Sequence, residues 1–397
     1  MINLKIKLIW PGYAEGRYVI KAKGYILAVL RWGDKHGVLE DWGVFAYVPI
    51  DPAGNGSFYF PNARGIPRGA THVYAHCLSS DFLSYEDVFA EIPPKFLYET
   101  SIPENVQKFS VLTDLHLASK PRRIKNTLSA AHSEKILLLG DIINDGLSKQ
   151  FEQFEECIKE TASDKIILPV IGNHDVLHDS HGDIADGCCN YEEFQKYLLS
   201  KVEDKGFTIS YDPNSLAYSI RFENIDIIGI QCVISGRKFS FPEGKQILWL
   251  ENYLKENQNS SWHLILCHAP LLTHNPNRNT GNPYLAKDKM LQEIIDNCGN
   301  VIFLSGHTHV SPNSLIGSAE FVRGNIYLNC GSAVDTDTSG EQGLMSHDWN
   351  DGCITELLVS DSEVEICTSS VKTGIKFPRG YYRFNKADIR HLQTKTS

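Results

Sequence analysis

Five short motifs rich in metal-ligand residue types follow one another along the chain, and they constrain its fold more than any other feature. The motifs are Asp114-Leu115-His116, Gly140-Asp141, Gly172-Asn173-His174-Asp175, Cys267-His268 and Gly306-His307-Thr308-His309. Each follows an apolar run of the length of a buried strand, at 109–112, 136–139, 166–171, 264–267 and 301–304. Because the carboxyl ends of parallel strands meet at one edge of an open α/β sheet, the motifs can converge in space there.

The side chains of these motifs have the donor chemistry of a transition-metal site. Three carboxylate or amide oxygens and four imidazoles suit zinc, iron or manganese, whereas calcium would require oxygen almost throughout. Alternate side chains of a strand point to opposite faces, so His307 and His309 both reach the centre only if the Gly306 turn breaks the strand or if they face different ions. We therefore expect a two-metal centre with seven ligands: Asp114, His116, Asp141, Asn173, His268, His307 and His309.

The ordered series resembles the motifs of the calcineurin-like metallophosphoesterase superfamily, over roughly residues 104 to 365. The resemblance implies an α/β fold of four layers, with two β-sheets between helices, and two divalent ions (manganese, zinc or iron) as cofactors. It also implies which residues hold each ion. One ion would take Asp114, His116, Asp141 and His309, and the other Asp141, Asn173, His268 and His307, so that Asp141 bridges them.

A phosphoesterase reaction follows from this resemblance. Two divalent ions can clamp the attacking and leaving oxygens of a phosphoryl group and lower the pKa of a bound water, which makes a metal-bound hydroxide the nucleophile. By resemblance His174 is the general acid or the oxyanion stabiliser, and Asp145 or Asp175 is a candidate to orient its ring. The alternative for His174 is a structural histidine that caps a loop.

Differences between this chain's motifs and those of other branches of the superfamily narrow the class of phosphoesterase that the chain resembles. Purple acid phosphatases have Asp-x-Gly and Gly-Asp-x-x-Tyr motifs, where this chain has His116 and Asn144. Serine/threonine phosphatases usually add an arginine after the second and third motifs, where this chain has Asp145-Gly146 and Asp175-Val176. The chain is therefore more similar to the bacterial branch of cyclic-nucleotide and glycerophosphodiester phosphodiesterases.

The substrate is the least constrained part of the function. Candidate contacts lie between His268 and His307, where Arg278 could pair with a phosphate oxygen and Tyr284 could stack on a base, with Asn275 nearby. Each is also what a plain exposed loop contains. We expect a phosphodiesterase or phosphatase (phosphomonoesterase) acting on a small phosphate ester or a nucleotide. The alternatives are a nuclease, a phospholipid-head-group hydrolase with the same centre, or a metal-binding scaffold without activity.

Composition and charge add limits on partners and location. A net charge of −10 argues against stable nucleic-acid binding. No membrane-spanning run and no secretory leader pattern is present, so cytoplasmic is the expected address, while the sequence leaves the oligomeric state open. Residues 371–397 hold seven Lys or Arg against one acid, and we expect a basic, exposed C-terminal tail rather than one that binds an anionic partner or docks on the acidic body.

The ten cysteines show no regular spacing, and several lie in apolar strands, so we expect buried free thiols. Cys188-Cys189 is the exception, and we place it in a polar loop. That loop also holds the acid and histidine side chains of His178, Asp179, His181, Asp183 and Asp186, and a third metal site is the alternative reading.

The region before the motifs has a different pattern. Residues 1–98 alternate apolar and polar side chains in short runs separated by Gly- and Pro-rich turns, which predicts a β-sandwich of immunoglobulin or fibronectin type. The catalytic domain is expected at 104–370, after a linker at Ile102-Pro103. Within it, apolar residues at helical spacing predict helices at 148–159, 191–202 and 244–256.

Overall fold

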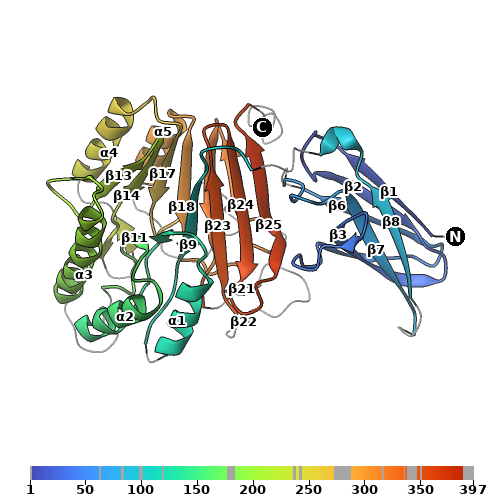
Figure 1. Ribbon diagram of the computed structural model, residues 1–397, viewed down its shortest axis with the longest axis horizontal. Helices are drawn as coiled ribbons and strands as arrows, with labels where there is room; N and C mark the ends of the chain where they lie inside the picture. The colour runs from blue at the N-terminus through green and yellow to red at the C-terminus, as the bar shows by residue number, and fades with distance from the viewer. Residues whose placement is uncertain are drawn as a thin grey trace.

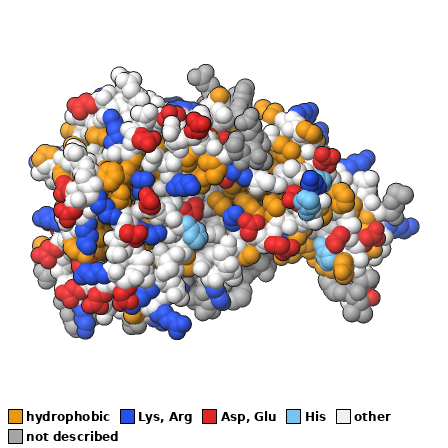
Figure 2. All heavy atoms as spheres, in the orientation of Figure 1, with side chains coloured by type: hydrophobic (Ala, Val, Ile, Leu, Met, Phe, Trp, Pro, Cys, Tyr) orange, Lys and Arg blue, Asp and Glu red, His pale blue; other side chains and the backbone are white. Residues whose placement is uncertain are grey.

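The computed structural model describes the chain over most of its length. The described residues are 2–61, 64–81, 85–97, 102–118, 120–176, 184–235, 238–240, 244–271, 288–314, 317–334, 336–337, 347–348 and 351–387. Within this part of the chain, no helix is both long enough and apolar enough to cross a membrane. Figure 2 shows acidic and basic side chains interspersed over the visible face of the molecule, so the net negative charge is not gathered in one patch there.

The N-terminal domain consists of two antiparallel sheets packed face to face. The smaller sheet has the order β1 (Asn3–Leu8), β2 (Gly16–Lys21), β6 (Asn55–Phe60). The larger has the order β4 (Gly37–Val38), β3 (Tyr25–Asp34), β7 (His72–Ser79), β8 (Tyr85–Glu91), with β5 (Ala46–Pro49) paired to β3. Alternating buried side chains form its core, in which Trp32 stacks on Phe45 at 4.7 Å between ring centroids. The expectation of an all-β N-terminal domain is confirmed.

After a short 3₁₀ helix (η1, Pro94–Phe96), the rest of the chain builds two larger sheets (Figure 1). The six-stranded sheet has the order β11 (Ile166–Pro169), β10 (Lys135–Leu138), β9 (Gln107–Leu112), β23 (Cys353–Val359), β24 (Glu363–Ser370), β25 (Lys376–Asn385). The seven-stranded sheet has the order β12 (Ile209–Tyr211), β13 (Tyr218–Phe222), β14 (Ile225–Gly229), β17 (Trp262–Leu266), β18 (Val301–Ser305), β20 (Asn325–Asn329), β19 (Ala319–Val322). Two hairpins complete the strands: β15 (Val233–Ser235) with β16 (Lys238–Ser240), and β21 (Thr336–Asp337) with β22 (His347–Asp348).

Five helices cover these two sheets: α1 (Pro121–Ala130), α2 (Ser148–Thr161), α3 (Ile184–Asp204), α4 (Lys245–Glu256) and α5 (Asp288–Asp296). In β9 and β10, Val111 and Leu137 face the apolar core between the sheets, whereas Leu112 and Ile136 pack toward the helices. This alternation buries both faces of each sheet. The four-layer α/β fold is therefore confirmed, and helices α2, α3 and α4 cover the three helical segments expected from the sequence.

The parallel strands bring their carboxyl ends to the same edge of each sheet. In the first sheet Leu112 is level with Leu138, and Leu138 with Pro169. In the second sheet Leu266 is level with Leu304. The metal-ligand motifs follow these positions directly, so the register of the sheets places all five motifs together.

Two expectations about the periphery were wrong. Lys376–Asn385 is not an exposed tail but strand β25, in which Tyr381 and Arg383 are buried. The strand is buried because it pairs with β24 on one side and the N-terminal domain packs beside it, with Trp42 edge-on to Tyr381 at 5.1 Å (Figure 1). Residues 388–397 lie outside the described part. Cys188 and Cys189 lie in helix α3 and not in a loop, although both are exposed.

Candidate metal centre

The ligand motifs share an unusual backbone conformation. Only eight residues other than glycine have a left-handed backbone in the described part of the chain, and five of these are expected ligands: Asp114, His116, Asp141, His307 and His309, with φ between 46° and 68°. Such conformations are uncommon for residues with a side chain, cost about 1–3 kcal/mol each, and cluster at functional sites. They also end the strands abruptly, so that His307 and His309 are not related by strand alternation.

Glycines precede the ligands where backbones approach closely. A Cβ atom on Gly306 would collide with the Thr113 hydroxyl, and one on Gly172 would collide with the backbone and carboxylate of Asp141. Gly140 has φ +87° and faces Gly172 equally closely. These contacts explain why three of the five motifs place a glycine directly before a candidate ligand.

One group of candidate ligands consists of Asp114, His116 and His309. His309 Nε2 lies 3.0 Å from Asp114 Oδ1 and 3.1 Å from His116 Nε2. Donors bound to one ion at about 2.0–2.2 Å lie roughly 3.0–3.5 Å from one another, so this spacing fits a shared cation. The second oxygen of Asp114 accepts hydrogen bonds from the Thr113 hydroxyl (2.6 Å) and the His307 N–H (2.9 Å), which aims the first oxygen at the imidazoles.

A second group consists of Asp141, His268 and His307, and a third, His116, Asp141 and His174, shares a residue with each of these two. His268 Nε2 lies 3.3 Å from Asp141 Oδ2 and 3.2 Å from the side-chain oxygen of Asn173, which adds the amide to the group. At 2.7 Å, His268 Nδ1 donates to the Leu139 carbonyl, so Nε2 presents its lone pair to the centre. A hydrogen bond of this kind on the far nitrogen is typical of metal-binding histidines.

Asp141 lies between the two groups. Its Oδ2 atom is 3.3 Å from His268 Nε2 in one group and 3.9 Å from His116 Nε2 in the other. Its Oδ1 atom accepts the backbone N–H of His174 at 2.7 Å, which fixes the carboxylate plane. One oxygen therefore faces both sets of imidazoles, as a bridging carboxylate requires.

The electrostatics of the centre favour a cation. Burial lowers the pKa of His116 and of His307 to about 4, so both are neutral near pH 7. Burial acts in the same direction on His268, but the negative charges of Asp141 and Asp114 outweigh it and raise its pKa to about 10. Burial opposes ionisation of the two carboxyls, yet the charges of nearby histidines hold the pKa of each below its usual range. Two buried carboxylates beside the neutral imidazoles of His116 and His307 form a donor set that divalent ions fit, and a bound cation would replace the proton that His268 carries without one.

His174 lies beside this centre. Its ring is edge-on to that of His116 at 4.7 Å between centroids, and Nδ1 lies 3.0 Å from the backbone carbonyl oxygen of Asn144. That carbonyl orients the ring, so the expectation that Asp145 or Asp175 does so was wrong. Asp145 instead accepts hydrogen bonds from the side chains of Gln150 (2.8 Å) and Asn144 (2.9 Å).

Asp175 is buried and joins two ligand loops. One carboxylate oxygen accepts the backbone N–H groups of Ile142 (2.8 Å) and Ile143 (3.1 Å), just after Asp141. The other accepts the N–H of Gly172 at 2.8 Å, just before Asn173. Burial, reinforced by the charge of Asp141, raises the pKa of Asp175 to about 7. The residue acts on the architecture of the centre rather than on His174.

Sequence reasoning missed the groups that orient the ligands. Thr113 and the carbonyls of Leu139 and Asn144 hold Asp114, His268 and His174, and two of the three are backbone atoms without a sequence signature. The candidate substrate contacts Asn275, Arg278 and Tyr284 lie outside the described residues. So do His178, Asp179, His181 and Asp183 of the segment considered as a third metal site.

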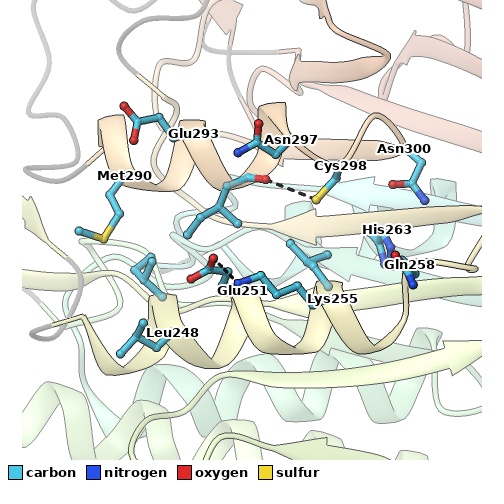
Figure 3. A pocket seen from close by; sticks show the side chains of 13 residues that line it. Leu248, Glu251, Lys255, Gln258, His263, Met290, Glu293, Asn297, Cys298 and Asn300 are labelled. Carbon is cyan, nitrogen blue, oxygen red and sulfur yellow. Dashed lines mark hydrogen bonds and ion pairs between the residues drawn. The ribbon is translucent and has the colours of Figure 1, made fainter.

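A separate cavity of about 570 Å³ lies between α4 and α5 (Figure 3). Glu251 and Lys255 line it from α4, Met290 and Glu293 from α5, and His263 at one end. His263 is the second residue of β17 and lies near its amino end, whereas the metal ligands follow the carboxyl ends. The cavity is therefore distinct from the metal centre.

Comparison with known proteins gives one family match and several similar solved structures. The family model described as calcineurin-like phosphoesterase matches residues 108–311. Among solved structures, PhoD is similar with a TM-score of 0.43 and 11% identity, over 92% of this chain and 85% of that chain. Vps29 from Entamoeba histolytica, complexed with Zn²⁺, has a TM-score of 0.31 and 14% identity, over 70% of this chain and 99% of that chain. A conserved uncharacterized protein of Streptococcus pneumoniae, described as a predicted phosphoesterase, has a TM-score of 0.32 and 13% identity, over 71% of this chain and 99% of that chain.

No curated protein sequence matches the chain. The family match nevertheless covers more than half of its length and includes all seven expected ligands. The protein therefore belongs to the calcineurin-like phosphoesterase family.

Proposed function

We propose that this phosphoesterase uses two divalent ions to hydrolyse a small phosphate ester. The observation that carries the proposal is the position of Asp141 Oδ2, which faces His268 at 3.3 Å and His116 at 3.9 Å. Asp114, His116 and His309 would hold one ion, and Asn173, His268 and His307 the other, with Asp141 shared. The four imidazoles favour manganese, zinc or iron. When bound, such ions neutralise phosphate charge and make water a stronger nucleophile near neutral pH.

His174 is the group of the chain best placed to move a proton. Its Nδ1–H donates to the Asn144 carbonyl, so Nε2 is the nitrogen that can carry a proton to a leaving oxygen. The edge-on contact with His116 keeps the ring next to the first group of ligands. We assign His174 as the general acid. Asp141 fixes the neighbouring backbone through the His174 N–H, which links the position of the acid to that of the bridging carboxylate.

A substrate screen tests the proposal. The protein is stripped of metal, reconstituted with manganese, zinc or iron, and assayed with a nitrophenyl phosphate monoester, a nitrophenyl phosphodiester, a cyclic nucleotide, a glycerophosphodiester and single-stranded DNA. We expect hydrolysis of a small ester with two ions per chain by elemental analysis. Full activity with a single ion per chain would rule out the two-metal assignment. Preference for DNA would favour the nuclease alternative.

A further inference from the structure

Two buried thiols lie in contact behind the metal centre. The Sγ atoms of Cys232 and Cys267 are 3.4 Å apart, and the residues are 3% and 0% exposed. Cys267 directly follows β17, and Cys232 lies just past the end of β14, its parallel neighbour. Because Gly229 is level with Leu266 in this pair, the chain brings both cysteines to the edge of the sheet where the ligands gather.

We propose that Cys232 and Cys267 are a redox modification site that a peroxide converts to a disulfide. The peroxide first oxidises one thiol to a sulfenic acid and is reduced to water. The second thiol then attacks that sulfur, the S–S bond forms, and a second water leaves with the hydroxyl. Two S–H bonds are lost in total, and their protons and electrons leave in two molecules of water. The net reaction therefore needs no other reductant or oxidant.

The disulfide would move residues that carry metal ligands. A disulfide has an S–S length of about 2.05 Å, so the sulfurs must approach by more than an ångström. Cys267 precedes His268, and the backbone on both sides is tied to the next segment through Cys267 N–H to Leu304 (3.1 Å) and Gly306 N–H to His268 (3.0 Å). Because these hydrogen bonds hold the backbone on both sides, the movement of the sulfur atoms must be taken up by the cysteine side chains and by the backbone that joins Cys267 to His268.

Cys232 is linked to the loop that carries Asn173 through the preceding residue, Gln231. The side-chain oxygen of Gln231 accepts the backbone N–H of Ile171 at 2.9 Å, two residues before Asn173. The Gln231 backbone is held in turn by the side chain of Gln246 in α4, at 2.6 Å and 2.8 Å. His268 and Asn173 belong to the same group of ligands. Disulfide formation therefore acts on that group, and its expected effect is a roughly 10- to 100-fold loss of affinity for the ion there, as when the groups supporting metal ligands are altered.

The experiment uses the full chain carrying Cys188→Ser and Cys189→Ser, which removes the exposed pair of thiols. The metal-loaded protein is treated with hydrogen peroxide and then with dithiothreitol, and each sample is divided between peptide mapping by mass spectrometry and elemental analysis. We expect a cross-linked peptide joining Cys232 to Cys267, two hydrogen atoms lighter than the thiols, together with loss of one of two ions. Both changes should reverse on reduction.

Cys232→Ala in the same background is the matched variant, since it removes one of the two thiols and Cys232 is not itself an expected ligand. It should keep its metal and its activity in peroxide, while Cys157→Ala, a buried cysteine of α2, should respond as the parent does. If Cys232→Ala fails to fold, Cys232→Ser takes its place. Absence of the cross-linked peptide overturns the proposal, and so does a cross-link that leaves metal content unchanged. The metal effect rests on the proposed function, whereas the cross-link does not. A reduced protein with no bound metal would therefore count against the proposed function alone.

Discussion

Nδ1 of His174 lies 3.0 Å from the backbone carbonyl oxygen of Asn144. Asn144 belongs to the loop after Asp141, so the ring of His174 is oriented by the same loop that supplies the carboxylate proposed to bridge two ions. A carbonyl oxygen accepts only, so Nδ1 carries a proton in this contact, and a proton held at Nε2 is the one that the ring can give to a leaving oxygen. The acid proposed for the reaction is thus held by the architecture of the metal centre and not by a separate carboxylate.

Replacing His174 with alanine tests its role as acid. We expect bound metal to be retained and turnover to fall roughly 10²–10⁴-fold for an ester with an alkyl or ribose leaving group, the usual range for a positioned general acid. Nitrophenolate leaves readily without a proton, so the loss should be much smaller with that leaving group. Steady-state rates on the two esters are the measurement. Equal losses would assign His174 to charge stabilisation or positioning, and loss of metal would support a structural role.

Replacing Asp141 with asparagine tests the bridge. The amide keeps the shape of the carboxylate but removes the negative charge between two cations, so we expect both ions to bind weakly and turnover to be lost. Elemental analysis and isothermal titration with manganese are the measurements. Asp145→Asn is the matched control, because Asp145 is a nearby acid that contacts Gln150 and Asn144 rather than the ligands. A variant of Asp141 that still binds two ions at parental affinity would contradict the assignment.

The convergence of the candidate ligands could be predicted from the sequence, whereas the groups that orient them could not. Asp114 and His268 each follow an apolar strand, and strand ends of one sheet meet in space, so periodicity and residue type were enough to place these side chains together. The left-handed backbone of five ligands has no such signature, since it results from close approaches such as that of Gly306 to Thr113. The Asn144 carbonyl that orients His174 is a backbone atom, and Asp145 was a plausible but wrong substitute.

Strand β25 was missed for a different physical reason. A strand with one solvent face alternates apolar and polar side chains, but Tyr381, Tyr382 and Arg383 are consecutive and all buried. One side of this strand packs against the catalytic domain, while Tyr381 joins the core of the N-terminal domain. Burial on both faces removes the alternation, and the basic residues then resemble a solvated tail. The sequence pattern alone therefore does not predict β25, because the second buried face depends on where the N-terminal domain packs.

The charges at this domain boundary give a third prediction. Arg68 of the N-terminal domain forms ion pairs with both Glu363 and Glu365 of β24, and Arg383 lies 3.0 Å from Glu363. All four side chains are largely buried. Arg68→Met removes the positive charge that pairs with both glutamates, while the hydrogen bond from the Tyr381 hydroxyl to Glu365 remains. We therefore expect a loss of about 3 kcal/mol in the free energy of unfolding. Urea denaturation followed by circular dichroism measures it.

Two controls accompany that measurement. Lys196→Met removes an exposed pair with Glu192 and should change stability by less than about 0.5 kcal/mol. Adding Glu365→Gln to Arg68→Met should recover part of the loss, because the uncompensated carboxylate is then gone. Metal content should stay at the parental value in all three variants. A loss for Arg68→Met no larger than that for Lys196→Met would mean that the boundary is held by apolar packing alone.

The fourth prediction concerns a carboxylate on the other side of the catalytic domain. Asp226 is fully buried and accepts hydrogen bonds from Arg221 (2.7 Å) and Ser260 (2.7 Å). Nδ1 of His263, which lines the cavity of Figure 3, lies 2.9 Å from the Asp226 carboxylate. Burial raises the pKa of this carboxyl, but the donors His263, Arg221 and Ser260 outweigh burial and lower it to about 2. These contacts tie the loops at the amino ends of β14 and β17 together.

The sign of the pH dependence follows from that shift. The folded pKa lies below the unfolded value of about 3.9, so Asp226 stabilises the fold fully above that pH, and its contribution is lost as pH falls toward 2. The contribution is about 1–2 kcal/mol, reduced from the full shift because the Arg221 side chain is 46% exposed.

The stability difference between the parent and Asp226→Asn should therefore be constant from pH 8 to 5 and shrink by that amount between pH 4 and 2. Both proteins lose metal alike as the ligand histidines become protonated, so the difference isolates Asp226. Urea denaturation at each pH measures it, with the exposed Asp164→Asn as a control whose difference from the parent should stay flat. A parent–Asp226→Asn difference that persists unchanged to pH 2 would show that the aspartate acts through its shape and not its charge.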